Sequence, residues 1–403
     1  MRRIVLLLAS MALAILLACG VALALPSETP DQTPTVNGTV RAIEQVGTNI
    51  WVGGKFTQFE QCKNTVEPNV SNLAVFDSET NNCKNIAPKL GGTAPEVWDM
   101  SIYDENKQIE GDENVLIAGK FSGPSSTQKN LVLVKGAGPE AGQVIRWYNA
   151  PSLRSALAAP DLGRVYGGGV SLTAFEVGGK KLWSRAKTTV ESSLYSTNAP
   201  SPSYRDLELD ELDGQKIIWA ACACDAVAGE PAKALVKLSA DEGVPYPSWL
   251  AAANRSSWGM SVAKANGALY LGAGGSDYLA EFSKDGGKPT WVRDTSGSVQ
   301  VVEEMDSQLV IGGHFWEVAD QVGDNCGHRG GGKQNLDPND ECQTRKGIAA
   351  YSFEGQLNPN WSPTYAGKYS LVWALHVEGA RLHTGGEFLT VNGVTQNYYA
   401  RLS

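Results

Sequence analysis

Short apolar runs alternate with polar turns along most of this chain, and one phrase of that pattern keeps returning. The phrase is a short apolar run, two small residues, one variable residue and then usually Phe. Its copies lie about 55 residues apart on average: Trp51–Phe56, Leu116–Phe121, Val165–Val170, Ile218–Ala223, Tyr270–Gly275, Val310–Phe315 and His383–Phe388. Recurrence of this kind indicates a repeat architecture.

Each phrase has companion runs at similar offsets, which make a unit of three to four short strands. One β-rich run precedes the phrase by about ten residues, and another follows it. Turns of the Asp-Gly and Asp-x-x-Thr kind separate the runs, as hairpins require. No helical period of 3.6 residues persists in the mature chain. The units are therefore predicted to be small antiparallel sheets.

Seven such units predict an all-β fold, a single β-propeller over residues 39–403 with seven blades of four antiparallel strands. The fourth and fifth units have lost the paired Gly or the Phe, so six or eight blades are the alternatives. The last unit stops after its third strand. We therefore expect the N-terminal segment 25–38 to provide a closing strand, and the stretch from Thr33 to Thr39 is the expected donor that pairs with the C-terminal strand. The paired Gly residues are expected where neighbouring sheets approach closely.

Three motifs of the repeat resemble those of a known family, the secreted bacterial β-propellers of the delta-sixty-type repeat. They are the Val-Gly-Gly-x-Phe-Thr phrase, the Leu-Ala-x-x-Asp strand and the Trp-x-Pro strand. The family is known mostly as a domain of unknown function. The stretch Leu371–Ser403, with Gly385-Gly386-Glu387-Phe388 and Tyr399-Ala400-Arg401-Leu402, resembles that family most closely. The similarity covers Val40 to Ser403. It implies the fold and says little about function.

The N-terminus is typical of an export signal, because Arg2 and Arg3 precede an apolar run that extends to Leu25. Three outcomes stay open: cleavage after Ala24, lipid attachment at Cys19 as in a lipoprotein, and an uncut membrane anchor. The export signal is taken as residues 1–24. All three outcomes place the remainder outside the cytoplasm of a bacterium, either extracellular or anchored to the cell envelope.

Charge limits the partners. The full chain has 34 Lys and Arg residues, and two of them, Arg2 and Arg3, lie in the leader. The remainder therefore has 32 basic and 43 acidic residues, which gives a net charge of −11. A nucleic acid or an anionic membrane surface would require a basic face, so we expect neither. The chain is expected to be a monomer.

Six cysteines remain without Cys19, an even number that suggests disulfides in an oxidising compartment. We predict the pairs Cys62–Cys83 and Cys326–Cys342, each closing a long loop. Cys222 and Cys224 lie two apart on a predicted strand and point to the same face. They are either two buried structural cysteines or a strained local bridge, and a redox role is a further alternative.

Aligning the units identifies a candidate ligand-binding position in the first strand of each. The residue twelve before the first small residue of the phrase varies, whereas its neighbours are small or apolar. Trp98 and Arg205 take this place once loop insertions are allowed. The set is Arg41, Trp98, Ser155, Arg205, Met260, Gln300 and Trp373. If that strand lines the central channel, these side chains lie at one mouth, where they can hold a sugar or an acidic peptide. The alternative is that they plug the channel or pack between blades.

Catalytic signatures are not found in the sequence. It has no zinc-protease or nucleophile-elbow motif and no Walker loop, so we expect no catalytic residue, no metal and no cofactor. Asp337–Glu341, in the insertion from Ala319 to Lys346, offers oxygen ligands but lacks the Gly and distant Glu of a calcium loop.

Three functions are compatible with these observations. The first is a non-catalytic binding or scaffolding propeller at the cell envelope, whose partner is a protein or a cell-wall glycan. The second is an extracellular carbohydrate-active hydrolase or lyase. The third is a purely structural surface protein. The acids to test for the second are Asp99, Asp206, Glu303 and Glu304.

Overall fold

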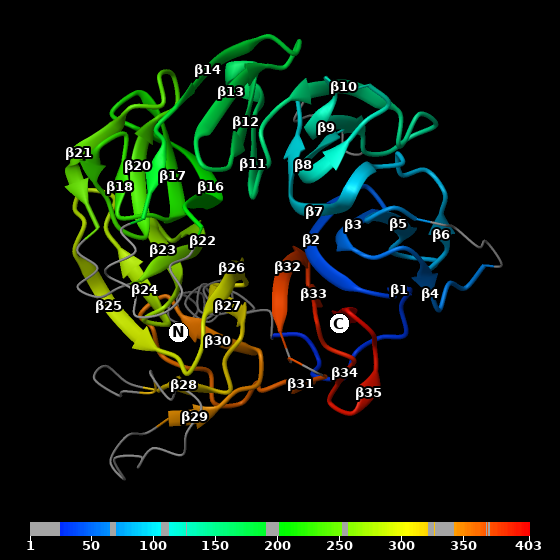
Figure 1. Ribbon diagram of the computed structural model, residues 1–403. Helices are drawn as coiled ribbons and strands as arrows, with labels where there is room; N and C mark the ends of the chain where they lie inside the picture. The colour runs from blue at the N-terminus through cyan, green and yellow to red at the C-terminus, as the bar shows by residue number, and fades with distance from the viewer. Residues whose placement is uncertain are drawn as a thin grey trace, which may run out of the picture.

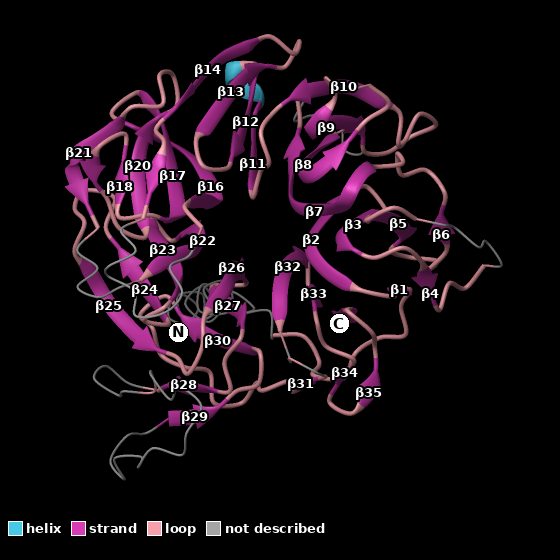
Figure 2. Cartoon of the chain, viewed as in Figure 1, coloured by secondary structure: helices cyan, strands magenta, loops and turns pink. Residues whose placement is uncertain are grey.

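The computed structural model describes residues 25–64, 70–105, 113–125, 127–190, 201–251, 257–320, 326, 342–367, 369 and 371–403. The export signal with Cys19 and the acidic stretch Asp337–Glu341 lie outside the described residues. No helix in the described part is long and apolar enough to cross a membrane. A single short 3-10 helix, η1 (Pro160–Leu162), interrupts a chain that is otherwise strands and loops across these ranges (Figure 2).

Antiparallel sheets lie radially around a common centre, with one strand of each sheet facing it (Figure 1). Five sheets have four strands each, named here from the centre outward. The first consists of β2 (Thr39–Val46), β3 (Asn49–Lys55), β5 (Leu73–Asp77) and β6 (Cys83–Lys84), and the second of β7 (Gly91–Tyr103), β8 (Asn114–Ser122), β9 (Lys129–Lys135) and β10 (Val144–Asn149). The third consists of β11 (Ser155–Ala159), β12 (Arg164–Gly168), β13 (Leu172–Glu176) and β14 (Lys181–Arg185), the fourth of β16 (Ser203–Leu212), β17 (Gln215–Ala223), β20 (Leu235–Ser239) and β21 (Pro245–Leu250), and the fifth of β22 (Trp258–Ala265), β23 (Ala268–Gly274), β24 (Tyr278–Phe282) and β25 (Pro289–Asp294).

Two further sheets have three strands within the described residues: β26 (Val299–Met305), β27 (Gln308–Gly313) and β30 (Ile348–Ser352); β32 (Val372–Glu378), β33 (Arg381–Gly386) and β36 (Tyr399–Leu402). The recurring phrase forms the second strand of every one of these sheets, which confirms the strand assignment made from the sequence. The innermost strands are β2, β7, β11, β16, β22, β26 and β32.

Small accessory sheets extend the edge at which the innermost strands begin. Each is formed by short strands from the loops that precede an innermost strand or follow a second strand. They are β1 (Thr35–Val36) with β4 (Phe59–Glu60); β15 (Thr188–Thr189) with β18 (Ala226–Val227) and β19 (Glu230–Pro231); β28 (Glu317–Ala319) with β29 (Cys342–Thr344); and β31 (Tyr365–Ala366) with β34 (Thr390–Val391) and β35 (Val394–Thr395). This face of the molecule is therefore the more elaborated one.

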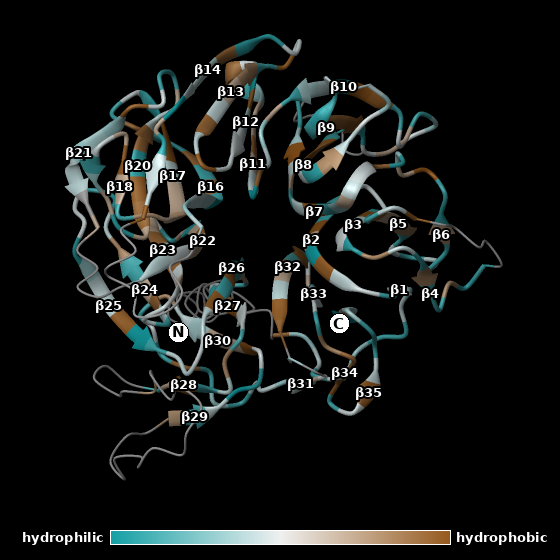
Figure 3. Ribbon diagram, in the orientation of Figure 1, coloured by the Kyte–Doolittle hydropathy of each residue, from teal (hydrophilic) through white to brown (hydrophobic). Residues whose placement is uncertain are grey.

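The hydrophobic core is divided into clusters of buried apolar side chains that lie between neighbouring sheets. Figure 3 shows hydrophobic residues on the strands of these sheets. Val75 and Val132, for example, share one cluster between the sheets of β2 and β7. The sheet of β32 packs on the sheet of β2 in the same way, and the rings of Phe76 and Tyr399 meet edge-on at 5.1 Å.

The paired Gly residues of the phrase lie where the backbone is crowded, as predicted. A Cβ on Gly312 would lie 2.6 Å from Val372 of the neighbouring sheet. Gly53 faces Val97 of its neighbour in the same manner, with 2.5 Å to Cγ1. Any side chain at these positions would push two sheets apart.

The N-terminal pairing differs from the prediction. Thr35 and Val36 do not pair with the C-terminal strand, because their backbone already pairs with β4. Earlier residues contact the C-terminal strand instead: Ser27 N–H donates to Ser403 O (3.0 Å), Asp31 N–H donates to Arg401 O (2.8 Å), and Pro30 bridges to Leu402. The expected segment from Thr33 to Thr39 was therefore placed several residues too late.

Three disulfides link the six described cysteines. Cys62–Cys83 and Cys326–Cys342 confirm the two predicted pairs. Cys222 and Cys224 are bonded to each other and fully buried. Of the two structural alternatives predicted from the sequence, separate buried cysteines or a local bridge, the structure therefore shows the local bridge. Disulfides in this number are typical of proteins outside the cytoplasm.

Candidate binding site at the channel mouth

One extra residue interrupts the innermost strand at the same place in six sheets. In β2, Val40 pairs with Gly54 and Ala42 with Gly53, which leaves Arg41 unpaired as a β-bulge. A bulge re-aims a side chain away from the regular alternation of a strand. The six bulged residues are Arg41, Trp98, Arg205, Met260, Gln300 and Trp373.

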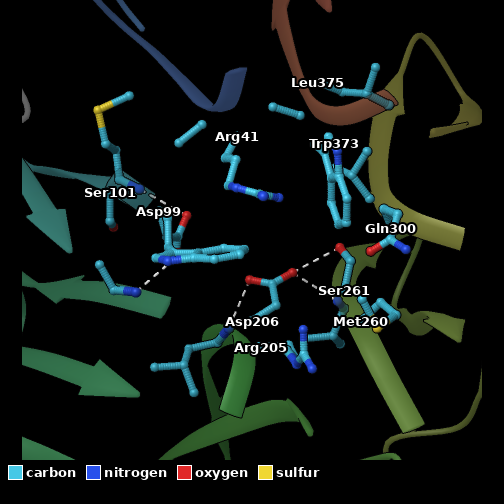
Figure 4. Close-up of a pocket in the computed structure, with 18 of the residues that line it drawn as sticks. Arg41, Asp99, Ser101, Arg205, Asp206, Met260, Ser261, Gln300, Trp373 and Leu375 are labelled. Atoms are coloured by element: carbon cyan, nitrogen blue, oxygen red, sulfur yellow. Dashed lines mark hydrogen bonds between the residues drawn. The ribbon is translucent and has the colours of Figure 1, made fainter. Parts of the chain in front are cut away.

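These six are the candidate residues predicted from the repeat alignment, and all of them line one cavity of about 340 Å³ at the centre of the sheets. Figure 4 shows Arg41, Arg205, Met260, Gln300 and Trp373 arranged around a common space. The structure thus brings the candidates together from six different sheets. Whether they bind a ligand remains a prediction.

The third unit corrects the alignment. β11 pairs with β12 without a bulge, so Ser155 sits opposite Gly168 and is fully buried. Arg154, the residue before it, lines the cavity instead. Sequence reasoning missed Arg154 because it assumed a constant spacing, which fails where the extra residue is absent.

The second Gly of the phrase and the bulge depend on each other. A Cβ on Gly54 would overlap the carbonyl oxygen of Thr39, two residues before the bulged Arg41. The same relation holds in other sheets, between Gly119 and Glu96 O, Gly313 and Ser298 O, and Gly386 and Leu371 O. The small residue therefore makes room for the backbone that aims the cavity side chain.

Aromatic rings and guanidinium groups alternate on one side of the mouth. Arg41 Cζ lies 3.9 Å from the ring centroid of Trp98 and 4.6 Å from that of Trp373, and Arg154 Cζ lies 3.5 Å from that of Trp98. Two guanidinium groups this close to one centroid cannot share a face without overlapping, so they cover opposite faces of Trp98. Such stacking holds a guanidinium in a fixed orientation.

Several hydrogen-bond donors at the mouth have no acceptor. Arg41 Nε pairs with Glu96 Oε1 at 2.5 Å, but Arg41 Nη1, Arg205 Nε and Trp373 Nε1 are buried without a partner in the described structure. Burial, followed by the like charges of Arg154 and Arg41, lowers the pKa of Arg205 to about 10. Burial also lowers the pKa of Arg154. The mouth is thus a site of excess positive charge with open donors.

A layer of polar side chains just below the mouth joins neighbouring sheets. Asp99 Oδ2 accepts a hydrogen bond from Ala156 N–H (2.8 Å). Asp206 Oδ2 accepts from Ser261 Oγ (2.8 Å) and from the next main-chain N–H, that of Val262 (2.9 Å) (Figure 4). Burial raises the pKa of both carboxyl groups despite these bonds. Asp99 and Asp206 therefore have a clear structural role as links between sheets.

Deeper in the channel lies a second layer with three glutamates and a histidine. Glu44, Glu208, Glu303 and His376 each stand three residues after a bulged residue, and Glu44 Oε2 lies 3.7 Å from His376 Nδ1. Burial, followed by neighbouring carboxylates, raises the pKa of Glu208 and of Glu303 to about 8 and also raises that of Glu44. Burial lowers the pKa of His376 to about 4. Glu208, Glu303 and His376 are therefore mainly uncharged at neutral pH.

Of the acids proposed for catalysis, Glu303 lies in this deeper layer, whereas Glu304 is exposed and outside the cavity lining. Sequence reasoning missed Glu44, Glu208 and His376. The constant three-residue offset from the bulged residues was the signal that could have found them. Within the described residues, no group of three or more His, Cys, Asp or Glu side chains is arranged to hold a metal ion.

Comparison with solved structures decides the fold. The WD40 β-propeller domain of Doa1 aligns with a TM-score of 0.54 and 10% identity, over 93% of this chain and 96% of that one. The chain has a β-propeller fold. The propeller also aligns with the computationally designed Ika8 protein (TM-score 0.49, 12% identity, 93% and 97% covered) and with BamB from Moraxella catarrhalis (0.44, 10%, 92% and 97%).

No family model matches the propeller. A comparison with curated proteins likewise found no match. At these identities the structural likeness shows the fold alone, because propellers carry many unrelated functions.

Proposed function

We propose that this protein is a non-catalytic binding propeller of seven blades, exported to the cell envelope, which holds its ligand at the bulge-lined mouth. The ring is closed where residues 27–31 meet the C-terminal strand. The observation that carries the binding role is the set of buried donors without acceptors at Arg41, Arg205 and Trp373. Buried polar groups normally have partners, and a ligand would supply them here.

The three disulfides and the apolar leader support a place outside the cytoplasm. The partner class follows from the same mouth, since a cavity of about 340 Å³ lies at the lower end of the range for small-ligand pockets. A glycan unit or one side chain of an envelope protein fits that size. Nucleic acid is not a partner in this proposal, because the mature chain is acidic.

The test is binding of residues 26–403 to a glycan and cell-wall array, with Trp98 and Trp373 changed to Ala together. We expect binding by the parent protein and its loss in the double variant. Trp373→Phe provides a milder change that keeps an aromatic ring but removes the Nε1 donor and part of the indole surface, and it should weaken binding. Trp316→Ala is the matched control, because Trp316 is 59% exposed and does not line the cavity. Undiminished binding by a folded double variant would contradict the proposal.

A hydrolase or lyase is the second candidate, and one observation favours it. Glu208 and Glu303 share the deeper layer with pKa values of about 8, which suits a general acid near neutral pH. Release of reducing ends from cell-wall glycans, lost in Glu303→Gln and kept in Glu304→Gln, would establish this activity. An absence of turnover with intact binding supports the non-catalytic role.

A further inference from the structure

The seven residues at the mouth divide into a cationic arc and a neutral arc. The cationic arc consists of Arg41 on β2, Arg154 just before β11 and Arg205 on β16. Trp98 on β7 lies between Arg41 and Arg154. The opposite arc comes from β22, β26 and β32 and carries Met260, Gln300 and Trp373. A ligand centred in this cavity meets positive charge on one side and an apolar, hydrogen-bonding surface on the other.

The cationic arc lacks enough negative charge of its own. Glu96 pairs with Arg41, while neither Arg154 nor Arg205 has an ion-pair partner among the residues that the structure describes. Removing a guanidinium from water without a counter-charge is unfavourable. Its planar fork matches a carboxylate in a two-point hydrogen bond. The missing counter-charge is thus best supplied by a bound anion.

The neutral arc favours a body with hydroxyl groups over a bare anion. Trp373 Nε1 is a buried donor without an acceptor, and the Gln300 amide both donates and accepts. Met260 and the indole of Trp373 offer apolar surface for the C–H face of a ring. A simple anion such as phosphate would leave this half of the cavity unused.

The acidic layer below does not oppose an anion at the mouth. Asp99 and Asp206 are held by main-chain N–H groups, and their pKa values are raised by burial. Glu208 and Glu303, whose pKa values are raised to about 8, are mainly protonated at neutral pH, and burial also raises the pKa of Glu44. Arg41, Arg154 and Arg205 lie nearer the opening than these glutamates, so a ligand that enters meets the arginines first.

We propose that the mouth binds a carboxylated sugar residue of an acidic glycan, with the carboxylate on Arg41, Arg154 and Arg205 and the sugar ring against Met260, Gln300 and Trp373. This inference rests on the proposed binding function and names its ligand class. An acidic peptide presents the same carboxylate without the hydroxylated ring, and the experiment separates the two.

The experiment measures binding of residues 26–403 to three probes by calorimetry: oligogalacturonate, the same oligosaccharide after its carboxyl groups are reduced to alcohols, and an oligoglutamate peptide. We expect oligogalacturonate to bind at least about tenfold more tightly than either other probe. Raising the salt concentration should weaken that binding, because charge pairs near a surface are screened.

The matched variants are Arg205→Gln and Arg185→Gln. Arg205→Gln removes a cavity charge and should weaken oligogalacturonate binding by about tenfold or more, while leaving the reduced oligosaccharide unaffected. Arg185 is exposed on the outer strand β14, so its variant should bind like the parent. Circular dichroism confirms that both variants are folded.

The outcomes separate this inference from the proposed function. Equal binding of the acidic and reduced oligosaccharides, or preference for oligoglutamate, would overturn the acidic-glycan inference while Trp98 and Trp373 could still be required for binding. Failure of a folded protein to bind any probe or array component would count against both proposals. Unchanged affinity of Arg205→Gln for oligogalacturonate would show that the arginines do not recognise the carboxylate.

Discussion

At the scale of single residues, Arg205 is a cation at the cavity mouth whose hydrogen bonding is incomplete within the described structure. Its Nε is buried without an acceptor among the described residues, and besides burial it is the positive charges of Arg154 and Arg41 that lower its pKa. Such a residue costs folding free energy, and residues of this kind are retained where they contribute to function.

The free protein should therefore become more stable when this charge is removed. Arg205→Met keeps the apolar stem and should raise the free energy of unfolding by about 1 kcal/mol, measured by urea denaturation without ligand. Arg185→Met on the exposed face of β14 should be close to neutral. A destabilised Arg205→Met would mean that the guanidinium is satisfied within the free protein.

A second expectation at this scale concerns Glu303 and pH. The folded-state pKa of about 8 exceeds the ordinary value of 4.5, so between these values the folded state binds more protons than the unfolded state. The free energy of unfolding must then fall as pH rises from about 5 to 8. Glu303→Gln should be more stable than the parent at pH 8 by on the order of 1–2 kcal/mol, with a smaller difference at pH 5.

Thermal denaturation at the two pH values measures this effect. Glu304→Gln is the neighbouring control, because Glu304 is exposed and outside the cavity lining. Equal stabilisation of Glu303→Gln at both pH values would show that the carboxyl ionises normally in the folded protein.

At the scale of elements, a small residue on the second strand makes room for the β-bulge on the innermost strand, as in the sheets of β2, β7, β26 and β32. Gly54→Ala should bring its Cβ against the carbonyl of Thr39, destabilise the protein by about 1–3 kcal/mol and displace Arg41 from Trp98. Gly286→Ala is the matched control, since a Cβ there meets open space. Denaturation midpoints and ligand affinity together test the coupling.

The strands were predictable because their repeating phrase is set by packing, and packing between radial sheets imposes the same demand in every unit. The bulged positions were predictable for the opposite reason, since they vary while their neighbours do not. Arg154 was missed because β11 lacks the bulge that the alignment assumed. The prediction for the segment from Thr33 to Thr39 was wrong because Thr35 and Val36 pair with β4. That pairing depends on tertiary contacts, which the local sequence pattern does not show.

At the scale of the whole molecule, the two ends of the described chain hold each other. Asp31 Oδ2 accepts hydrogen bonds from Arg401 Nε (2.7 Å) and Ser403 Oγ (2.6 Å), and Trp361 Nε1 donates to Pro26 O (2.9 Å). These contacts supply the last sheet with neighbours that its own unit lacks. Stability of the propeller should therefore depend on residues 26–31.

Asp31→Ala tests that dependence. The change leaves the mostly buried guanidinium of Arg401 without its carboxylate, so we expect a loss of about 1–3 kcal/mol in the free energy of unfolding. Asp285→Ala, at an exposed turn between β24 and β25, should change stability little. Equal melting temperatures for the two variants would show that the N-terminal segment contributes little to the fold.

The bulges have a consequence for how such a protein changes over time. A residue outside the regular pairing of its strand is one whose identity the strand does not dictate. Six such positions around one opening, together with Arg154 just before β11, can be exchanged singly or together while the glycine pairs and the apolar cores keep the scaffold intact. A library randomised only at Arg41, Trp98, Arg154, Arg205, Met260, Gln300 and Trp373 would therefore sample new recognition specificities on an unchanged framework, and natural divergence has the same set of positions open to it.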